Sequence, residues 1–512
     1  MTTDADAPPP GDNRTAELSA GDIGTGDIST EDVGPTGASR DHLRVKVSSA
    51  LRWSFFNSVF IRVSQLALSI LLARLIAPEQ FGVYAAALVV INIILSISEL
   101  GVSVSLVQHE GDISDMAPTV TTLSWASGAA LAAVCFLGAP YFASALGAPE
   151  ASGVIRLMSL AVVAAGGAAV PGAILQRNFR QDHKMLAEVI SFVVGTTIAV
   201  VLALMDFGPW ALAWSRVATN VVAALVMVYL TKERFWPGWD AVQARIVLSF
   251  GLPLAGSSLL IFVVLNVDYM VVGSVLGPVA LGYYLIAFNL SSWPVNAFST
   301  TIRSVSLAAF SRLRSDPEVF RESFGKALAS LMALTIPACI LLAVLAQPLL
   351  RVVYGTRWLP AAGPLAILSI LGALRVALEL AYDYLAASGK TRPILWIHLL
   401  WLAGLVPALI IGARVDGLRG VGWGHVVVVC LLVTPAYLVA LKRIGVTMRG
   451  VFRPLLLPLI GGVAMFVVIQ VVERFIHVDF WILAVGGVTS LATYTLIVLP
   501  MRKDLVLRRT SD

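Results

Sequence analysis

Arginine side chains inside long apolar stretches are the residues of this sequence best suited to chemistry. The deepest are Arg62 and Arg375, which lie near the middle of their stretches, and Arg303 lies about three helical turns from the end of its helix at Arg312. A guanidinium group presents a planar fork of N–H donors that matches the oxygens of a phosphate. Placing an ionised side chain at mid-bilayer costs at least ~2.5 kcal/mol. These arginines should therefore face protein or a wet cavity rather than lipid.

Two interpretations of these arginines stay open. In the first, they line a cationic cavity that binds an anionic group. In the second, they form buried ion pairs that only hold helices together. Arg156 and Arg216 lie about two turns inside their stretches, where either role fits equally well. Arg52, Arg74 and Lys326 lie near the ends of theirs, where snorkelling to the lipid headgroups explains them.

The acidic residues inside apolar stretches are fewer. Glu379 and Asp383 follow Arg375 at steps of four, so the three share one side of a helix. Arg375 and Glu379 could simply pair within that helix. Asp268 and Glu99 are the other candidates. A buried carboxylate can take up a proton and couple movement to a proton gradient, but the sequence does not show whether any of these does so.

The composition determines which elements must position these side chains. Of the 512 residues, 58% are hydrophobic and 13% charged, and the mean hydropathy is +0.84. Soluble domains contain about twice that charged fraction. The apolar residues come in runs of about 20, the length of a membrane-spanning helix. We therefore expect an all-α polytopic membrane protein. Cys135, Cys339 and Cys430 lie inside apolar runs without metal-binding spacing, so we expect no metal site, and we expect no cofactor. The net charge of +5 does not indicate nucleic-acid binding, because most basic residues lie in short loops.

One stretch of the sequence occurs twice. Residues 72–87, LARLIAPEQFGVYAAA, align without a gap on residues 272–287, VGSVLGPVALGYYLIA. The pairs that match are Pro78 with Pro278, Gly82 with Gly282, Tyr84 with Tyr284 and Ala87 with Ala287. Each copy joins two apolar runs, and its Pro and Gly predict a tight hairpin between two helices. The similar order of runs around both copies indicates an internal duplication.

The apolar runs predict about fourteen membrane-spanning helices, in two pseudo-symmetric six-helix lobes followed by two more helices. The expected spans are 51–76, 80–107, 117–138, 150–176, 184–205, 208–231, 246–275, 279–310, 323–347, 361–388, 392–412, 418–441, 453–472 and 479–500. The corresponding divisions are a disordered cytoplasmic tail (1–42), a first lobe (43–231), a cytoplasmic connector (232–245), a second lobe (246–441), two C-terminal spans (442–500) and a basic cytoplasmic tail (501–512).

Loop charge predicts the orientation. With the N-terminus in the cytoplasm, 22 Lys and Arg residues fall in cytoplasmic segments and 5 in outer loops. Because Lys and Arg are retained on the cytoplasmic side, this bias predicts a multi-pass protein of the cell (plasma or inner) membrane with both termini in the cytoplasm. The outer loops are too short to hold a folded domain.

Four segments resemble a known family. They are FIRVSQLALSILLARLIAPEQFGVYAAALVV (60–90), AILQRNFRQDHKMLAEVIS (173–191), VVYGTRWLPAAGPLAILSI (352–370) and YLAASGKTRPILW (384–396). Together they resemble the polysaccharide-exporter branch of the multidrug/oligosaccharidyl-lipid/polysaccharide flippase superfamily. The resemblance implies roughly twelve to fourteen helices in two lobes, a central cavity and alternating access.

The resemblance also implies a substrate. It is an undecaprenyl-pyrophosphate-linked oligosaccharide, moved from the inner to the outer leaflet for cell-surface polysaccharide biosynthesis. A pyrophosphate needs fixed cationic donors to leave the headgroup region, so the expected cavity is built from Arg62, Arg303 and Arg375, with Arg156 and Arg216 as further candidates. The expected partners are the lipid-linked glycan and the bilayer, and other polysaccharide assembly proteins stay open as partners.

Three rival functions have distinct requirements. A membrane glycan polymerase or ligase would need catalytic groups on a sizeable outer loop, which the chain lacks, so we expect no enzyme. A drug/cation antiporter of the same superfamily would need carboxylates in the first lobe, where deep arginines outnumber acids. A structural protein would place its deep charges outside any common cavity. The glycan is not identified, because the 12 Trp and 11 Tyr fit an interfacial belt as well as sugar stacking.

Overall fold

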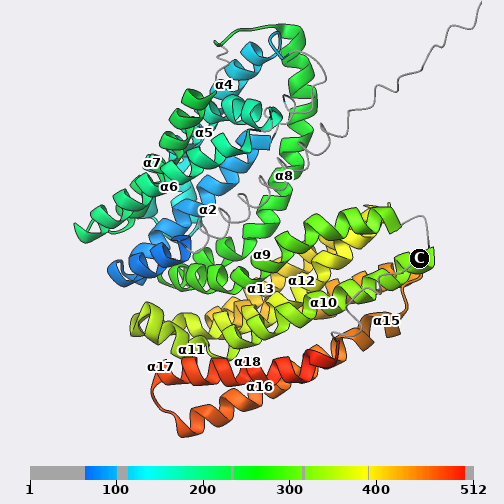
Figure 1. Cartoon of the computed structure of the whole chain (residues 1–512). Coiled ribbons are helices and arrows are strands. Elements are labelled where there is room, and N and C mark those ends of the chain that lie inside the picture. Colours follow the sequence, from blue (N-terminus) through cyan, green and yellow to red (C-terminus); the bar gives the residue numbers. More distant parts are fainter. Residues whose placement is uncertain are drawn as a thin grey trace, which may run out of the picture. The chain divides into compact units, whose positions relative to one another are not determined.

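The structure, a computed structural model, describes residues 64–100, 106, 113–178, 180–231, 236–313, 317–389 and 391–501, which all belong to one compact unit, Ser54–Asp512. Within α2, α8, α9 and α10, part of the side chains lies outside the description, including those of residues 98–100 and 297–313. The regular structure of the described residues is entirely helical (Figure 1).

In the described part of the first half of the chain, five long helices follow the short apolar helix Ser64–Leu75. They are α2 (Pro78–Leu100), α4 (Ala117–Ala145), α5 (Ala151–Arg177), α6 (Gln181–Leu204) and α7 (Pro209–Leu230). These bounds lie close to the predicted spans, although α4 continues to Ala145, past the predicted end at 138. Pro78 and Pro209 stand at helix starts, where the missing N–H of proline costs nothing.

The second half contains α8 (Ala241–Leu276), α9 (Pro278–Leu313), α10 (Pro317–Val344), α12 (Ala362–Ala387), α13 (Thr391–Val428) and α14 (Thr434–Arg443). Short helical pieces at 346–361 join α10 to α12. The chain then forms α15 (Met448–Phe452), α16 (Leu456–Phe475), α17 (Asp479–Trp481) and α18 (Gly487–Val498). Asp240 caps the start of α8, because its carboxylate accepts hydrogen bonds from the backbone N–H groups of Val242 and Gln243.

Helix α13 is two antiparallel helices rather than one. Asp416 and Gly417 have non-helical backbone angles, and Gly417 has φ +53°. Gly412 packs face to face with Gly420, so a Cβ on either would overlap the backbone of the other. The chain therefore turns back at 416–417, as the predicted spans 392–412 and 418–441 require.

Among the described residues, ten segments are long and apolar enough to cross a bilayer, and one of them, 392–443, contains this turn. Helices α8 and α9 stand outside that set, and each is 36 residues long. At ~1.5 Å per residue, either exceeds the ~30 Å of a bilayer core. The chain is an all-helical polytopic membrane protein.

The two copies of the repeated stretch pack directly against each other. A Cβ on Gly82 would overlap the carbonyl group of Pro278, and a Cβ on Gly282 would overlap that of Pro78. The contact is thus reciprocal, as expected for two halves related by pseudo-symmetry. Helix α2 runs against α9 beside this contact. Glycine is required at both positions because the backbones approach so closely.

The segment 350–361 covers the two hairpins. Trp358 is fully buried, and its indole Nε1 donates to the Ala73 carbonyl at 2.8 Å. Its ring meets Phe81 of one hairpin and Tyr283 of the other edge-on, with ring centroids 5.3 and 5.9 Å apart. Arg357 also donates to the Ala73 carbonyl, at 2.9 Å. A single aromatic side chain therefore contacts both copies of the repeat.

Candidate functional site

A polar cavity of about 330 Å³ lies where α2 meets the helices of the second half. Its lining from α2 includes Asn92, and α8 contributes Asn266 and Tyr269. The larger share comes from α9 and α12, with Phe288, Asn289, Ser292, Asn296 and Arg375. Amide side chains both donate and accept hydrogen bonds, so this lining can bind polar groups of several kinds.

Helical spacing explains why these polar residues face the same space. Asn289, Ser292 and Asn296 are three and four residues apart along α9, and Asn266 and Tyr269 are three apart along α8. Residues at these spacings share one face of a helix. Polar side chains in apolar helices are stable where they turn away from lipid, toward partners or water. The sequence interpretation weighed ionised residues only and therefore missed these amides.

Arg375 is the cationic residue among the described lining of this cavity. Its side chain is half-buried on α12 (Ala362–Ala387), and its Cζ lies 5.8 Å from the centre of the Phe288 ring. This distance is suited to a cation–π contact. Arg375 also lines a smaller neighbouring cavity with Asp268, Ser291, Trp401 and His425. One guanidinium thus stands between the polar cavity and a buried acidic group.

The acidic group is Asp268, which is almost fully buried at 2% exposed. Its carboxylate accepts hydrogen bonds from the Tyr284 hydroxyl at 2.8 Å and from the Tyr269 backbone N–H at 3.0 Å. Nε2 of His425 lies 3.8 Å from the same carboxylate and 3.3 Å from the Tyr284 hydroxyl. Arg375 is close enough to interact electrostatically with both Asp268 and His425. We call Asp268, Tyr284 and His425 the buried triad.

This arrangement can carry out two kinds of chemistry. The amides and Arg375 can bind phosphate oxygens or hydroxyl groups in the polar cavity. The buried triad can hold or release a proton close to that cavity, because both an acid and an imidazole are present. Among the described residues, no three His, Cys, Asp or Glu side chains gather as they would around a metal ion.

The structure brings some of the predicted residues together and separates others. Asp268 and Arg375, predicted on different helices, meet beside the polar cavity. Glu379 is half-buried on α12, outside the described lining, and forms no ion pair with the likewise described Arg375. The intrahelical pair considered from the sequence is therefore not formed. Asp383 is buried one turn further along, close enough to interact electrostatically with Tyr437 of α14 (Thr434–Arg443).

Two arginines of the first half lie away from the polar cavity. Arg156 is exposed on α5 (Ala151–Arg177), with its Cζ 5.5 Å from the Phe136 ring. Arg216 is half-buried on α7 (Pro209–Leu230), and its electrostatic influence reaches Tyr84. Its Nε is buried without a hydrogen-bond partner among the described residues. Arg62 lies outside the described residues, as do the side chains of Glu99 in α2 and Arg303 in α9.

Arg74 differs in detail from its expected role. Its side chain is exposed, but its Nε donates to the Val353 carbonyl at 2.9 Å and its Nη2 to the Val352 carbonyl. Snorkelling to headgroups alone does not describe it, because the guanidinium fastens the first hairpin to the segment that covers it.

The sequence is similar to known proteins over most of its length. The sequence model of the family described as "Polysaccharide biosynthesis protein" matches residues 71–363. The lipopolysaccharide biosynthesis protein WzxC of Escherichia coli K12 is 26% identical over 426 residues, which is 81% of this chain and 85% of that protein. The succinoglycan biosynthesis transport protein ExoT of Rhizobium meliloti is 29% identical, over 86% of this chain and 90% of that protein.

Solved structures share the fold. The lipid II flippase MurJ, in an inward closed conformation, superposes with a TM-score of 0.73 at 16% identity, over 88% of this chain and 99% of that chain. An inward-facing multidrug transporter of the MATE family gives a TM-score of 0.59 at 18% identity, over 74% of this chain and 93% of that chain.

Proposed function

Because the chain belongs to the family of polysaccharide biosynthesis proteins, we propose that it flips a polyprenyl-pyrophosphate-linked oligosaccharide from the inner to the outer leaflet by alternating access. Its fold is that of MurJ and MATE transporters, and it is a membrane transport protein of polysaccharide biosynthesis rather than an enzyme. The proposal adds the lipid carrier, the direction and the mechanism.

The polar cavity carries the proposal. Its walls come from α2 in the first half of the chain and from α8, α9 and α12 in the second, so it lies where two repeats could move against each other. Arg375 supplies a fork that fits a pyrophosphate, and the surrounding amides supply neutral donors. A cavity of about 330 Å³ is at the small end for ligand sites, so it would hold the head of the lipid carrier rather than a whole glycan.

The proposal includes the arrangement in the membrane. The chain would cross it about fourteen times, as two six-helix lobes and two further helices, with both termini in the cytoplasm. The two hairpins would then lie at the outer side, where they pack against each other and against Trp358. Alternating access would require this contact to open.

A drug/cation antiporter is the alternative from the same superfamily. Such a site would attract its cargo with a carboxylate that lines the cavity. Among the described residues that line the polar cavity, the charged one is an arginine, and Asp268 lies behind it in the smaller cavity. This order favours an anionic cargo.

Reconstitution tests the proposal directly. Full-length protein would be incorporated into vesicles with the lipid-linked glycan extracted from the producing cells, placed first in one leaflet. A lectin outside the vesicles would then report glycan that reaches the outer leaflet. We expect lectin labelling to increase only in vesicles that contain the protein. An equal rate in protein-free vesicles, or transport of a cationic dye instead of the glycan, would reject the proposal.

A further inference from the structure

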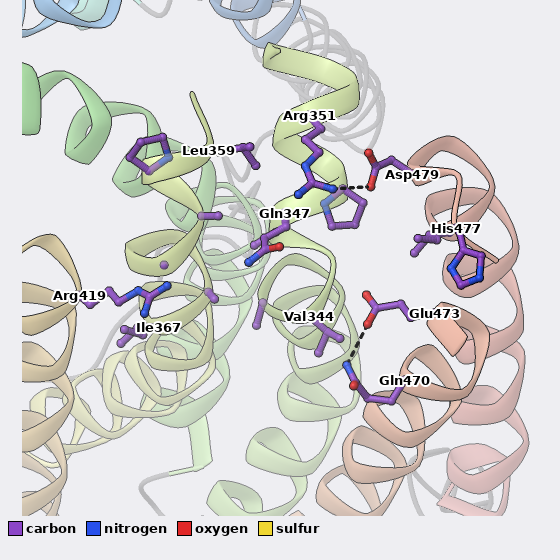
Figure 2. A pocket seen from close by; sticks show the side chains of 18 of the residues that line it. Val344, Gln347, Arg351, Leu359, Ile367, Arg419, Gln470, Glu473, His477 and Asp479 are labelled. Atoms are coloured by element: carbon purple, nitrogen blue, oxygen red, sulfur yellow. Dashed lines mark hydrogen bonds and ion pairs between the residues drawn. The ribbon is translucent and has the colours of Figure 1, made fainter. Parts of the chain in front are cut away.

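A second and larger cavity lies between α10, α12 and α13 on one side and residues 470–482, which end α16 and form α17, on the other (Figure 2). Its volume is about 830 Å³, within the ~300–1,000 Å³ range of small-molecule sites and enough for more than one sugar ring. One wall comes from α10, α12 and α13 with the segment 346–363, and the other from residues 470–482. We call it the α16 pocket, after the helix Leu456–Phe475 that supplies much of the second wall.

Opposite charges reach into the α16 pocket from both walls. Figure 2 shows Arg419 pointing in from one side and Glu473 from the other, with Gln347 between them. The Arg419 stem lies flat on α12 because Gly363 has no Cβ there to block it. Among the described residues, Arg419 has no hydrogen-bond or ion-pair partner, so its donors are available to a ligand.

Two polar contacts fix the side chains of the wall formed by residues 470–482. Arg351 Nη1 lies 3.4 Å from Asp479 Oδ1, and Gln470 Nε2 donates to Glu473 Oε2 at 3.2 Å (Figure 2). Each contact uses only part of the hydrogen-bonding capacity of its groups, since a guanidinium has five donors and a carboxylate about four acceptor sites. The pocket therefore presents oriented donors and acceptors together.

This lining fits a saccharide better than the other available ligands. A sugar hydroxyl both donates and accepts, so it can bind arginine, carboxylate and amide side chains in one pocket. A phosphate would bind Arg351 and Arg419 but would be repelled by Glu473 and Asp479. A lipid tail would leave all of these charges without water. Trp423, half-exposed in the same lining, offers an aromatic face on which the C–H side of a sugar ring can stack.

We propose that the α16 pocket binds sugar rings of the translocated glycan. This inference rests on the proposed function, which supplies the glycan, and on the proposed orientation, which places the pocket on the outer side of the membrane. In that orientation, the segments at 346–363, 413–419 and 474–481 all lie at the outer side, where the glycan arrives. The pocket would give a role to α16 and α17, which lie beyond the part of the chain that the family model matches.

Binding of the free glycan can be measured without transport, so it reports on the α16 pocket independently of the proposed function. The probe is the oligosaccharide released by mild acid from the glycolipids of the producing cells, titrated by calorimetry into full-length protein in lipid nanodiscs. We expect saturable binding to the wild type. Glu473→Gln, Arg419→Gln and Trp423→Leu should each raise the Kd about 10-fold or more, the usual cost of losing a hydrogen bond to a charged group or a stacking contact.

Matched variants control for general effects. Arg414→Gln changes an exposed arginine five residues before Arg419, and Trp396→Leu changes an exposed tryptophan in the other arm of α13. Neither side chain lines the pocket. Both should leave the Kd unchanged. Thermal unfolding of each variant identifies those that have lost their fold. Arg419→Gln and Trp423→Leu replace exposed side chains, so they decide the question even if Glu473→Gln does not fold.

Several outcomes would overturn the proposal. They are absence of saturable binding to folded wild type, equal weakening by the pocket and control variants, and displacement of the probe by glycerol phosphate as readily as by excess glycan. The proposed function fails on a different result, which is unchanged surface glycan in cells that lack the chain. Arg375→Ala separates the two further, since it should stop export and leave binding of the free glycan intact.

Discussion

At the scale of single residues, one arginine joins the two kinds of chemistry in the candidate site. Arg375 lines the polar cavity on one side and stands beside the buried triad on the other. A phosphate bound in the cavity and a proton on Asp268 would therefore both change the field around the same guanidinium. This proximity gives a physical route by which proton movement and substrate binding could be linked.

Replacement of Arg375 tests the cationic cavity. Arg375→Ala should abolish glycan export, and Arg375→Lys, which keeps the charge but loses the fork, should give intermediate export. The same loss is expected for Arg62→Ala, which rests on the sequence alone. Export would be measured by complementation, with the membrane level of each protein measured alongside. Arg414→Ala, at an exposed position, is the control. Normal export from a well-expressed double variant, Arg62→Ala with Arg375→Ala, would show that these arginines do not form a pyrophosphate-binding cavity needed for export.

Replacement of Asp268 tests the coupling role of the buried triad. Asp268→Asn keeps the size of the side chain and can still accept the Tyr284 hydrogen bond, but it cannot carry the proton. Transport in vesicles should then no longer respond to an imposed proton gradient. Tyr284→Phe removes one donor from a buried carboxylate and should destabilise the protein by ~1–3 kcal/mol. Asp206→Asn, at an exposed position, serves as control. If the Asp268→Asn variant still responds to the gradient, Asp268 has a purely structural role.

The sequence predicted only the charged part of this site. Asp268 and Arg375 stood out because an ionised group in an apolar helix is costly and therefore visible. The four cavity asparagines are uncharged polar residues, and their lower cost makes them inconspicuous among many Ser, Thr and Asn side chains. Their common face becomes evident only when it is known which helices pack together, since four helices contribute to one cavity.

At the scale of elements, the repeated hairpins determine how closely the two halves can approach. Their reciprocal contact depends on Gly82 and Gly282, because a side chain on either would occupy the space of a backbone carbonyl. The sequence predicted the duplication and both turns. It could not show that the two turns touch, because the close approach also involves α2 against α9, which are distant in the sequence.

A methyl group added at this contact should weaken it. Gly82→Ala should lower the Tm of the purified protein, with an overpacking cost of ~1–3 kcal/mol. Gly487→Ala is the matched control, since a Cβ there would meet nothing within 4 Å. Alanine in a helix is normally favoured over glycine, so the control should leave the Tm unchanged or raise it. Equal Tm values for the two variants would show that the hairpin contact is not tight in solution.

At the scale of the whole molecule, most helix bounds were predictable because each helix needs about 20 apolar residues to cross the bilayer. The bounds 362–387 of α12 differ from the predicted 361–388 by one residue at each end. The last predicted span, 479–500, consists instead of α17, a π-helical turn at Ile482–Gly486 and α18. Hydropathy reports how long an apolar run is, but it carries no information on such local changes of helix geometry.

The orientation of the molecule is the remaining prediction, and single exposed positions can test it. Lys442 and Arg443 end α14 in a loop predicted to be cytoplasmic, whereas Arg414 lies beside the α13 turn, predicted to be outside. All three side chains are exposed, so a cysteine at either site can react.

In a variant that carries no native cysteine, Arg443→Cys should be labelled by an impermeant maleimide only after the cells are opened, and Arg414→Cys should already be labelled in intact cells. The 22-to-5 distribution of Lys and Arg is the reason, because translocating basic loops is disfavoured. If Arg443→Cys were labelled in intact cells and Arg414→Cys only in opened cells, the orientation would be the opposite of the predicted one. The α16 pocket would then lie on the side from which the glycan departs.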